Sequence, residues 1–265
     1  MLDVALYSKA LSAPISLFKH EDREQSIRDL SKESAMFMWF QLLFDTLLDS
    51  KQTEDSKNQM LTICEEQYKD NEVQLKKITE FRDQYSADTA IKWYTRDCFL
   101  YRMLNKALRA QNIDFIFNYR FFIIDLYNTL LKLHSSPSAV KAVNVYRGQM
   151  MSVEELQKLL NNVGGFISIN TFLSTTIDCG VASEFSGTGA GRPLFESIVF
   201  DIEVTEDSAT IKPFAEVQNF SHMKDENEVL FSVGTVLKIE SVEQATDAVW
   251  YVRLISSSKG NEELQ

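Results

Sequence analysis

The sequence predicts an α+β protein, in which an N-terminal helical lobe packs on a β-sandwich-like core. Before Pro137, apolar residues recur at intervals of three and four, which is typical of helices with one buried face. After Pro137, short segments alternate apolar and polar residues, which is typical of strands. The chain has 265 residues, of which 45% are hydrophobic, so it can bury a sizeable core.

The charge and the cysteine count argue against several kinds of partner and site. A net charge of -11 repels phosphate backbones and anionic lipids, so we expect no nucleic acid and no membrane as partners. Three cysteines and three histidines lie scattered along the chain, which predicts neither a disulfide framework nor a metal site. No secretory signal is seen, nor an apolar run of the roughly 18 residues that a membrane span needs. A cytoplasmic protein is the expectation.

The helical half divides at a polar stretch. Asp49 to Asn58 contains no apolar side chain and is predicted to be a linker. We therefore expect a helical extension over residues 1–50 and a second domain over residues 51–257, whose helical lobe covers 51–136. The expected helices lie within 27–48, 59–85 (one or two helices), 93–108 and 113–133.

The extension carries an unusual apolar run, Met36 to Phe40. One isolated helix could not expose so much apolar surface without a partner. We expect this run to pack on the helical lobe; the alternative is a docking surface for another domain or protein.

The β core is expected over residues 137–257. Val143 to Gly148 reads as a strand that the glycine stops, and Ser152 opens a capping box for a helix that ends at Leu160. Phe166 to Leu173 alternates in polarity, so one strand is predicted there. Further strands are expected at 198–204, 229–233, 236–239 and 249–255.

Three segments at strand ends carry the chemically interesting side chains: Tyr146-Arg147-Gly148, Leu173-Ser174-Thr175-Thr176 and Glu226-Asn227-Glu228. Residues two apart in an extended chain face the same way, so the two glutamates are predicted to stand together. An arginine offers a fork of donors to a phosphate, hydroxyls can bond a ribose, and a carboxylate can stabilise an oxocarbenium-like centre. Singly, each segment could be an ion pair, a turn or an acidic loop; jointly they predict recognition of a phosphorylated sugar.

In this order the segments resemble the signature of the mono-ADP-ribosyltransferases of the arginine-serine-glutamate (R-S-E) class. The resemblance runs from Lys57 to Ile255 and includes two helical segments, Trp93 to Thr95 and Leu104 to Arg109, before the core. It implies the ADP-ribosyltransferase fold with an NAD-binding β core. It also implies NAD as substrate, no metal, and a protein acceptor that carries an arginine.

The resemblance assigns the NAD-binding residues. Arg147 would hold a phosphate of NAD, and the backbone of Gly148 would bond the nicotinamide amide. Ser174 would orient the catalytic glutamate and the nicotinamide ribose, while Thr175 would support the strand geometry of this NAD-binding segment. Phe185 matches an aromatic that packs on nicotinamide, with a core side chain on a short helix as the alternative.

The resemblance also assigns the catalytic acids. Glu228 would bond a ribose hydroxyl and stabilise the cationic sugar as nicotinamide leaves, so the catalytic set is Arg147, Ser174, Glu226 and Glu228. Glu226 marks transfer to arginine, because it can bind the incoming guanidinium and help remove its proton.

Three places depart from the family pattern or match it only loosely. Thr176 replaces the second serine of the Ser-Thr-Ser segment, one hydroxyl for another. The glycine-rich stretch Phe185 to Arg192 could close over NAD, and Phe220, in the family's substrate-selecting loop, could contact a target protein or anchor the loop. Two other functions stay open from the sequence: an NAD glycohydrolase that uses the same cleft, and a non-catalytic interaction module.

Overall fold

The protein is described from a computed structural model. The described residues are 27–136, 139, 143–187, 189–204, 212–222, 227–246 and 248–256, with side chains from Met38 onward and without that of Val143. The chain forms two compact units. The first contains Leu42–Thr129 and Phe220–Met223; the second contains Ser26–Gln41, Leu130–Asn219 and Lys224–Gln265. The predicted domain boundaries after residues 50 and 136 stay predictions.

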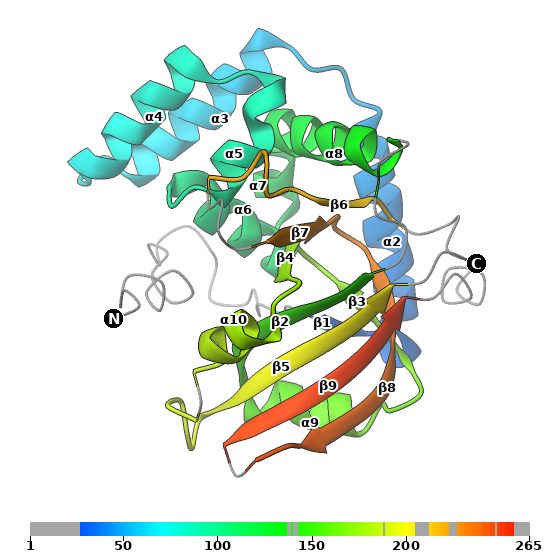
Figure 1. The fold of residues 1–265 in the computed structure, drawn as a ribbon. Helices are drawn as coiled ribbons and strands as arrows, with labels where there is room; N and C mark the ends of the chain where they lie inside the picture. The colour runs from blue at the N-terminus through cyan, green and yellow to red at the C-terminus, as the bar shows by residue number, and fades with distance from the viewer. Residues whose placement is uncertain are drawn as a thin grey trace. The chain divides into compact units, whose positions relative to one another are not determined.

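Helices dominate the N-terminal part of the chain (Figure 1). In chain order they are α2 (Leu30–Leu48), α3 (Glu54–Gln67), α4 (Glu72–Gln84), the short 3-10 helix η2 (Ala87–Thr89), α5 (Ala90–Thr95), α6 (Phe99–Ala110), α7 (Ile113–Asn118) and α8 (Arg120–His134).

An aromatic cluster forms the centre of the first unit. Phe81 of α4 is fully buried and stacks on Tyr85, with 4.2 Å between the ring centroids. It also makes edge contacts with Trp93, Phe99 and Phe122, which come from α5, α6 and α8. Offset and edge-on aromatic pairs add to the free energy of burial, so this cluster holds four helices together.

A nine-stranded sheet dominates the second unit, in the order β1-β3-β8-β9-β5-β2-β4-β7-β6. Its strands are β1 (Ile27–Asp29), β2 (Val143–Ser152), β3 (Phe166–Ile169), β4 (Leu173–Thr176), β5 (Phe195–Val204), β6 (Phe214–Glu216), β7 (Glu228–Phe231), β8 (Val236–Gln244) and β9 (Val249–Ser256). Neighbours pair antiparallel except β5 and β9, which are parallel. Two short helices, α9 (Val153–Leu160) and α10 (Cys179–Phe185), interrupt the strands.

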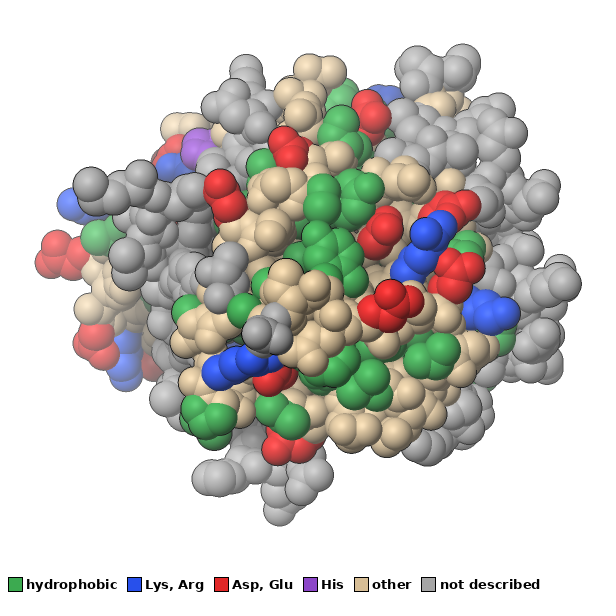
Figure 2. Space-filling model, turned by 60° about the horizontal axis from the view of Figure 1, so that its bottom comes forward, with side chains coloured by type: hydrophobic (Ala, Val, Ile, Leu, Met, Phe, Trp, Pro, Cys, Tyr) green, Lys and Arg blue, Asp and Glu red, His purple; other side chains and the backbone are tan. Residues whose placement is uncertain are grey.

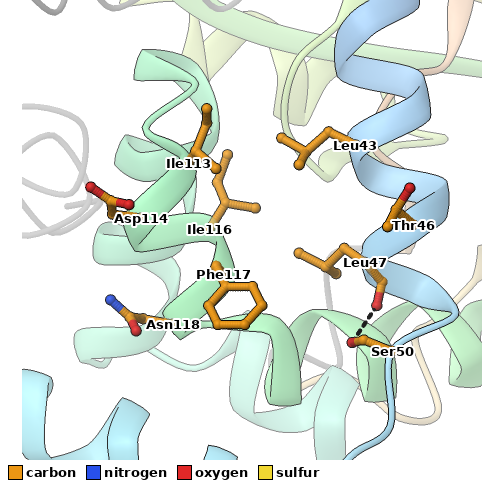
Figure 3. A pocket seen from close by; sticks show the side chains of 9 residues that line it. All are labelled: Leu43, Thr46, Leu47, Ser50, Ile113, Asp114, Ile116, Phe117 and Asn118. Atoms are coloured by element: carbon orange, nitrogen blue, oxygen red, sulfur yellow. Dashed lines mark hydrogen bonds between the residues drawn. The ribbon is translucent and has the colours of Figure 1, made fainter.

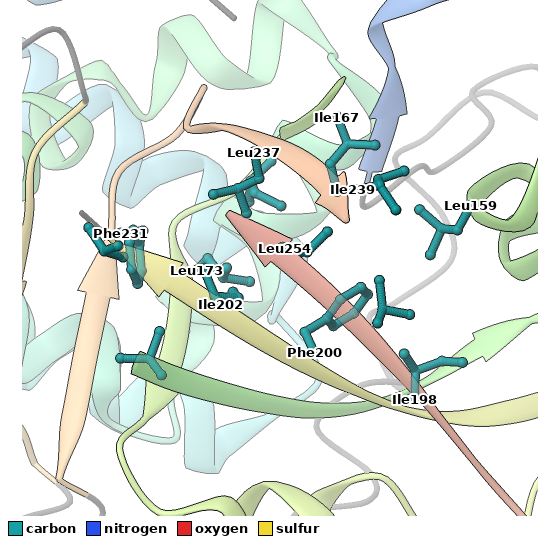
Figure 4. Close-up of a cluster of buried hydrophobic side chains, with 14 of the residues drawn as sticks. Leu159, Ile167, Leu173, Ile198, Phe200, Ile202, Phe231, Leu237, Ile239 and Leu254 are labelled. Carbon is teal, nitrogen blue, oxygen red and sulfur yellow. The ribbon is translucent and has the colours of Figure 1, made fainter. Parts of the chain in front are cut away.

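The sheet encloses one hydrophobic core (Figure 4). Buried side chains from β3, near one end of the strand order, and from β4 and β7, near the other end, belong to the same cluster. Residues 170–172 alone join β3 to β4, although these strands lie five places apart in the strand order. Five strand spacings across a flat sheet come to roughly 24 Å, more than so short a connection can span, so the sheet curls over its own core. This is the sandwich-like arrangement expected, and the α+β class is confirmed.

Several predicted elements have different limits. Ile27 lies in β1, which pairs with β3, and the predicted helix begins only at Leu30. The polar stretch predicted as a linker is half helical: Thr53 caps α3, its hydroxyl accepting from the Ser56 backbone, so the helix begins at Glu54. The predicted single helix over 113–133 is two helices, since Tyr119 ends α7 and α8 follows at once.

Two strand predictions are also wrong. Residues 166–173 form no single strand, because β3 ends at Ile169 and β4, elsewhere in the sheet, begins at Leu173. Gly148 does not stop β2, which continues to Ser152. The predicted cap is confirmed: Ser152 accepts a hydrogen bond from the Glu155 backbone at the start of α9.

The apolar run of the extension packs within the chain where its side chains are described. Met38 of this run packs against Val236 of β8, in the β core and not on the helical lobe that was expected. Beyond the run, Phe44 of α2 makes an edge contact with Tyr127 of α8. Phe40 is buried, whereas Trp39 is 43% exposed. The side chains of residues 36 and 37 lie outside the described part.

Candidate active site

The predicted arginine and serine meet because β2 and β4 are neighbours in the sheet. Tyr146 pairs with Thr176 across these strands. The Arg147 guanidinium Nη1 donates a hydrogen bond of 2.6 Å to the backbone carbonyl of Ser174. Residues 27 positions apart are thereby joined at one point of the sheet.

The predicted glutamate joins them from the next strand. β4 pairs with β7, with Thr176 opposite Glu228. The Ser174 hydroxyl donates a 2.6 Å hydrogen bond to Oε1 of Glu228. Glu228 is only 3% exposed, so its carboxylate is held by protein groups and largely removed from water. The structure therefore brings Arg147, Ser174 and Glu228 together.

The two threonines of the segment have structural partners. Neighbouring residues of a strand face opposite sides, so Thr175 points away from Ser174. Its buried hydroxyl donates a 2.7 Å hydrogen bond to the carbonyl of Val229 and thus supports the β4–β7 pair. The hydroxyl of Thr176 accepts from the Asp178 backbone at the turn into α10.

Gly148 lies where β2 passes directly under α10. A Cβ atom at this position would overlap the carbonyl oxygen of Ala182 in that helix. The strand can approach the helix this closely only without a side chain. Helix α10 is also tied to β9 by a contact of 3.5 Å between the Cys179 thiol and the Tyr251 hydroxyl, which raises the pKa of Tyr251 to about 12.

Phe185 is the last residue of α10 and is 36% exposed. It is therefore not the core side chain that was its alternative explanation. Beyond it, Gly187 and Gly189 adopt positive φ angles of 82° and 92°, conformations that favour glycine. The Gly189 backbone donates to the Ser197 hydroxyl, which fastens this stretch to β5.

Glu226 lies outside the described residues, but the argument that placed it beside Glu228 is wrong. Asn227 has a φ of 43°, in the left-handed region, and β7 begins only at Glu228. The chain is not extended at Asn227, so the alternation of a strand does not apply across this residue.

Sequence reasoning missed one residue in contact with this group. The Nε of Arg147 donates a 3.0 Å hydrogen bond to the side-chain oxygen of Gln149. The sequence prediction ended this strand at Gly148, so Gln149 was not placed on the same strand face as Arg147.

A model of the NAD:arginine ADP-ribosyltransferase family matches residues 43–262. The chain belongs to this family. A search of curated protein sequences finds no match. Enzymes of this family transfer a single ADP-ribosyl group and take NAD as substrate, as expected from the resemblance.

Solved ADP-ribosyltransferases have similar structures. The C3 exoenzyme of Clostridium limosum is 18% identical with a TM-score of 0.49, over 65% of this chain and 86% of that one. Exoenzyme S of Pseudomonas aeruginosa, solved with a human 14-3-3 protein and carba-NAD, is 17% identical with a TM-score of 0.49, over 78% and 90%. The Vis toxin of Vibrio splendidus is 19% identical with a TM-score of 0.47, over 81% and 90%.

The loop before the acid pair of this ADP-ribosyltransferase is fixed to a helix of the first unit. The His222 backbone donates a 2.8 Å hydrogen bond to the hydroxyl of Thr95, at the end of α5. In the same loop Ser221 is buried and Phe220 is 43% exposed. The loop is therefore anchored by residues other than Phe220, whose ring stands partly in solvent.

A pocket in the first unit is not part of this group of residues. It has a volume of about 460 Å³ and lies between α2 and α7, with Leu43, Leu47, Ile116 and Phe117 on its walls (Figure 3). None of the predicted site residues lines it.

The described surface shows neither a metal-binding cluster nor a basic patch on the face drawn in Figure 2. Within the described residues, no cluster of three or more His, Cys, Asp or Glu side chains could hold a metal ion. On the face in Figure 2, basic side chains lie singly or beside acidic ones. Among the described residues, Arg253 forms ion pairs with Glu203 and Glu240. None of the described helices combines the length and apolar character needed to cross a bilayer.

Proposed function

We propose that this ADP-ribosyltransferase moves ADP-ribose from NAD to an arginine side chain of a protein acceptor and releases nicotinamide. The observation that carries the proposal is the hydrogen-bonded line from Arg147 through Ser174 to Glu228. It links the Arg147 cation, which can bind the phosphates of NAD, to the Glu228 carboxylate, which can stabilise the reacting sugar. Arginine as the acceptor rests on Glu226 and on the family description.

In this proposal Arg147 binds a phosphate of NAD. Its Nε and Nη1 are hydrogen-bonded to the protein, whereas its Nη2 bonds none of the described residues. The two N–H groups of Nη2 are thus available to a phosphate. The backbone of Gly148 bonds the nicotinamide amide, Thr175 holds the strand that carries Ser174, and Phe185 covers the nicotinamide ring with its exposed face.

Glu228 stabilises the transition state. The bond between C1′ of the ribose and the nicotinamide nitrogen breaks, and its electron pair neutralises the pyridinium as nicotinamide leaves. Positive charge then develops on the ribose as an oxocarbenium. A carboxylate already fixed by the Ser174 hydroxyl, and shielded from water, stabilises that charge without first reorganising.

The acceptor arginine completes the reaction. A guanidinium nitrogen bonds to C1′ and must lose a proton, although its pKa in water lies above about 12. Glu226 binds the guanidinium and accepts this proton. Phe220, exposed in the same loop, contacts the acceptor protein.

The experiment distinguishes the roles of Glu226 and Glu228. Nicotinamide release is measured with and without agmatine, a small arginine mimic, and transfer to arginine-containing proteins is measured by mass spectrometry. Glu228→Gln should lower both nicotinamide release and transfer by roughly 100-fold or more, because the charge stabilisation is lost. Glu226→Gln should abolish arginine transfer and retain nicotinamide release.

Glu72→Gln, an exposed acid at the start of α4, is the matched control and should behave as wild type. If wild type releases nicotinamide at a rate that agmatine does not change, and modifies no arginine, the protein is an NAD glycohydrolase. If NAD raises the melting temperature of no variant, including wild type, the proposed use of NAD fails.

A further inference from the structure

We propose that Gln149 is a positioning residue for the NAD-binding arginine. Its side-chain amide holds the Arg147 guanidinium in the orientation that aims Nη2 at the phosphates. This inference rests on the proposed function, because it concerns how Arg147 binds NAD. It goes beyond that function in assigning a role to a residue outside the arginine-serine-glutamate signature.

The two anchors of Arg147 come from different strands. Gln149 lies two residues further along β2, on the same face, and its oxygen accepts from Nε at 3.0 Å. The Ser174 carbonyl of β4 accepts from Nη1 at 2.6 Å. Both neighbours of Nη2 within the planar ion are thereby held.

Two hydrogen bonds fix the orientation of the Arg147 guanidinium, which one hydrogen bond would not. A single hydrogen bond leaves a guanidinium free to turn about its terminal bonds, because the ion is planar but its stem is flexible. Hydrogen bonds at two of its three nitrogens define the plane of the ion. With Gln149 removed, only the Ser174 carbonyl would hold the plane, and Nη2 would sample several directions.

The anchors are also uncharged. Arg82, Arg96 and Arg253 each bond a glutamate, which neutralises their charge locally. Arg147 instead bonds an amide oxygen and a peptide carbonyl. It is therefore fixed in place while its full positive charge is left for an anionic ligand. A carboxylate at position 149 would fix the ion equally well but would compete with the phosphates.

The experiment measures the dissociation constant of NAD for the full chain by calorimetry, in variants at positions 147 and 149. Gln149→Met keeps the size of the side chain and removes the acceptor; we expect roughly 10-fold weaker NAD binding, from the loss of a hydrogen bond to a charged group. Gln149→Glu keeps an acceptor but adds a negative charge that repels the phosphates. We expect this variant to bind NAD at least as weakly as Gln149→Met does. In turnover, Gln149→Met should raise KM for NAD and change kcat by less than about 3-fold.

A double-mutant cycle decides whether Gln149 acts through Arg147. In an Arg147→Ala background, adding Gln149→Met should change NAD binding by less than about 2-fold. Arg147→Lys replaces Arg147→Ala if the latter does not fold, as judged by its melting temperature. Gln157→Met, on α9 with its amide bonded to Asn161 at the surface, is the control for this type of substitution and should bind NAD as wild type does.

The outcomes separate the two proposals. If Arg147→Ala weakens NAD binding while Gln149→Met does not, or if the two substitutions weaken it additively, the role of Gln149 is wrong and the proposed function stands. If Gln149→Glu binds NAD as tightly as wild type, the requirement for an uncharged anchor is wrong. If Arg147→Ala binds NAD as wild type does, the proposed function loses its phosphate contact, and the role of Gln149 falls with it.

Discussion

At the scale of single residues, the site depends on where each side chain sits in its strand. Ser174 and Thr175 are neighbours in β4, yet one bonds Glu228 and the other bonds the backbone of Val229. The alternation of a strand produces this division: one hydroxyl bonds the buried carboxylate of Glu228 and the next strengthens the β4–β7 pair. An exchange of these two residues would therefore disturb both tasks.

Gly148 gives a prediction at this scale. Gly148→Ala should lower the free energy of unfolding by about 1–3 kcal/mol, since the new methyl group would force α10 and β2 apart. Thermal or urea unfolding measures the change. Gly180→Ala is the matched control within α10, where a methyl group meets only the side-chain oxygen of Asp178, at 3.1 Å; it should leave stability equal or slightly higher. Equal stability of Gly148→Ala and wild type would contradict the prediction.

The position of each site residue in its strand decides whether the sequence could reveal it. Ser174 and Glu228 were predictable from the chain because each lies at or next to the start of an apolar strand. Arg147 was placed at a strand end that does not exist, since β2 continues to Ser152, and was identified through the resemblance instead. Gln149 was not predicted, because a glutamine within a strand looks like any half-exposed polar residue. The pairing of Glu226 with Glu228 stays a prediction, and its strand argument fails because Asn227 takes the left-handed conformation, which asparagine can adopt.

At the scale of elements, buried connections explain most of the wrong predictions. Residues 170–172 join β3 to β4, and all three are buried, with Asn170 only 1% exposed. A connection without exposed polar residues leaves no turn signal in the sequence, so β3 and β4 were merged. Tyr119 is similarly fully buried between α7 and α8. Caps, by contrast, depend on local hydrogen bonds, and the one at Ser152 was predicted correctly.

Asp125 of α8 gives a prediction about how the helices are held. This buried carboxylate accepts hydrogen bonds from the Tyr85 hydroxyl at 2.7 Å and from the Gln52 amide at 2.8 Å. Burial, together with the nearby Asp125 charge, raises the pKa of Tyr85, so its hydroxyl remains a donor. Tyr85→Phe should therefore lower the free energy of unfolding by about 1–3 kcal/mol, because the carboxylate loses a donor.

Tyr127→Phe is the control for this substitution, since its hydroxyl bonds none of the described residues. It should change stability by less than about 0.5 kcal/mol in the same denaturation experiment. A Tyr85→Phe protein as stable as the Tyr127→Phe protein would show that Asp125 does not need this donor.

The pair of Glu80 and Arg96 gives a pH dependence. Both guanidinium nitrogens Nη1 and Nη2 of Arg96 bond the Glu80 carboxylate at 2.8 Å, and these hydrogen bonds lower the pKa of Glu80. Because folding lowers this pKa, the charged pair stabilises the folded protein fully at pH values above the pKa of a carboxylate in the unfolded chain. That stability is lost as the pH falls through the lowered pKa of the folded protein. Because the pair is partly exposed, Glu80→Gln should cost only about 0.5 kcal/mol at pH 7. Melting curves should show the cost disappearing as the pH falls below the lowered pKa of Glu80, where both proteins lack the charge. A cost that persists there would point to packing instead.

At the scale of the whole molecule, the sequence predicted the class and the kind of core but not the sheet order. Helices followed by short strands indicate an α+β protein, and the signature segments indicate the family. Neither shows that β9, the last of the described strands, lies between β8 and β5 and runs parallel to β5. Such pairings connect distant segments, and their register depends on contacts that no local pattern records.

The ends of the sheet have a consequence for how the protein behaves at high concentration. Among the described strands, the outermost members at both ends, β1 and β6, are only three residues long. Each therefore offers few unpaired backbone groups to a strand of another molecule, and short edges of this kind hinder intermolecular β-pairing. A concentrated solution of the folded protein should resist conversion to cross-β aggregates, even though its central strands are long and rich in apolar residues.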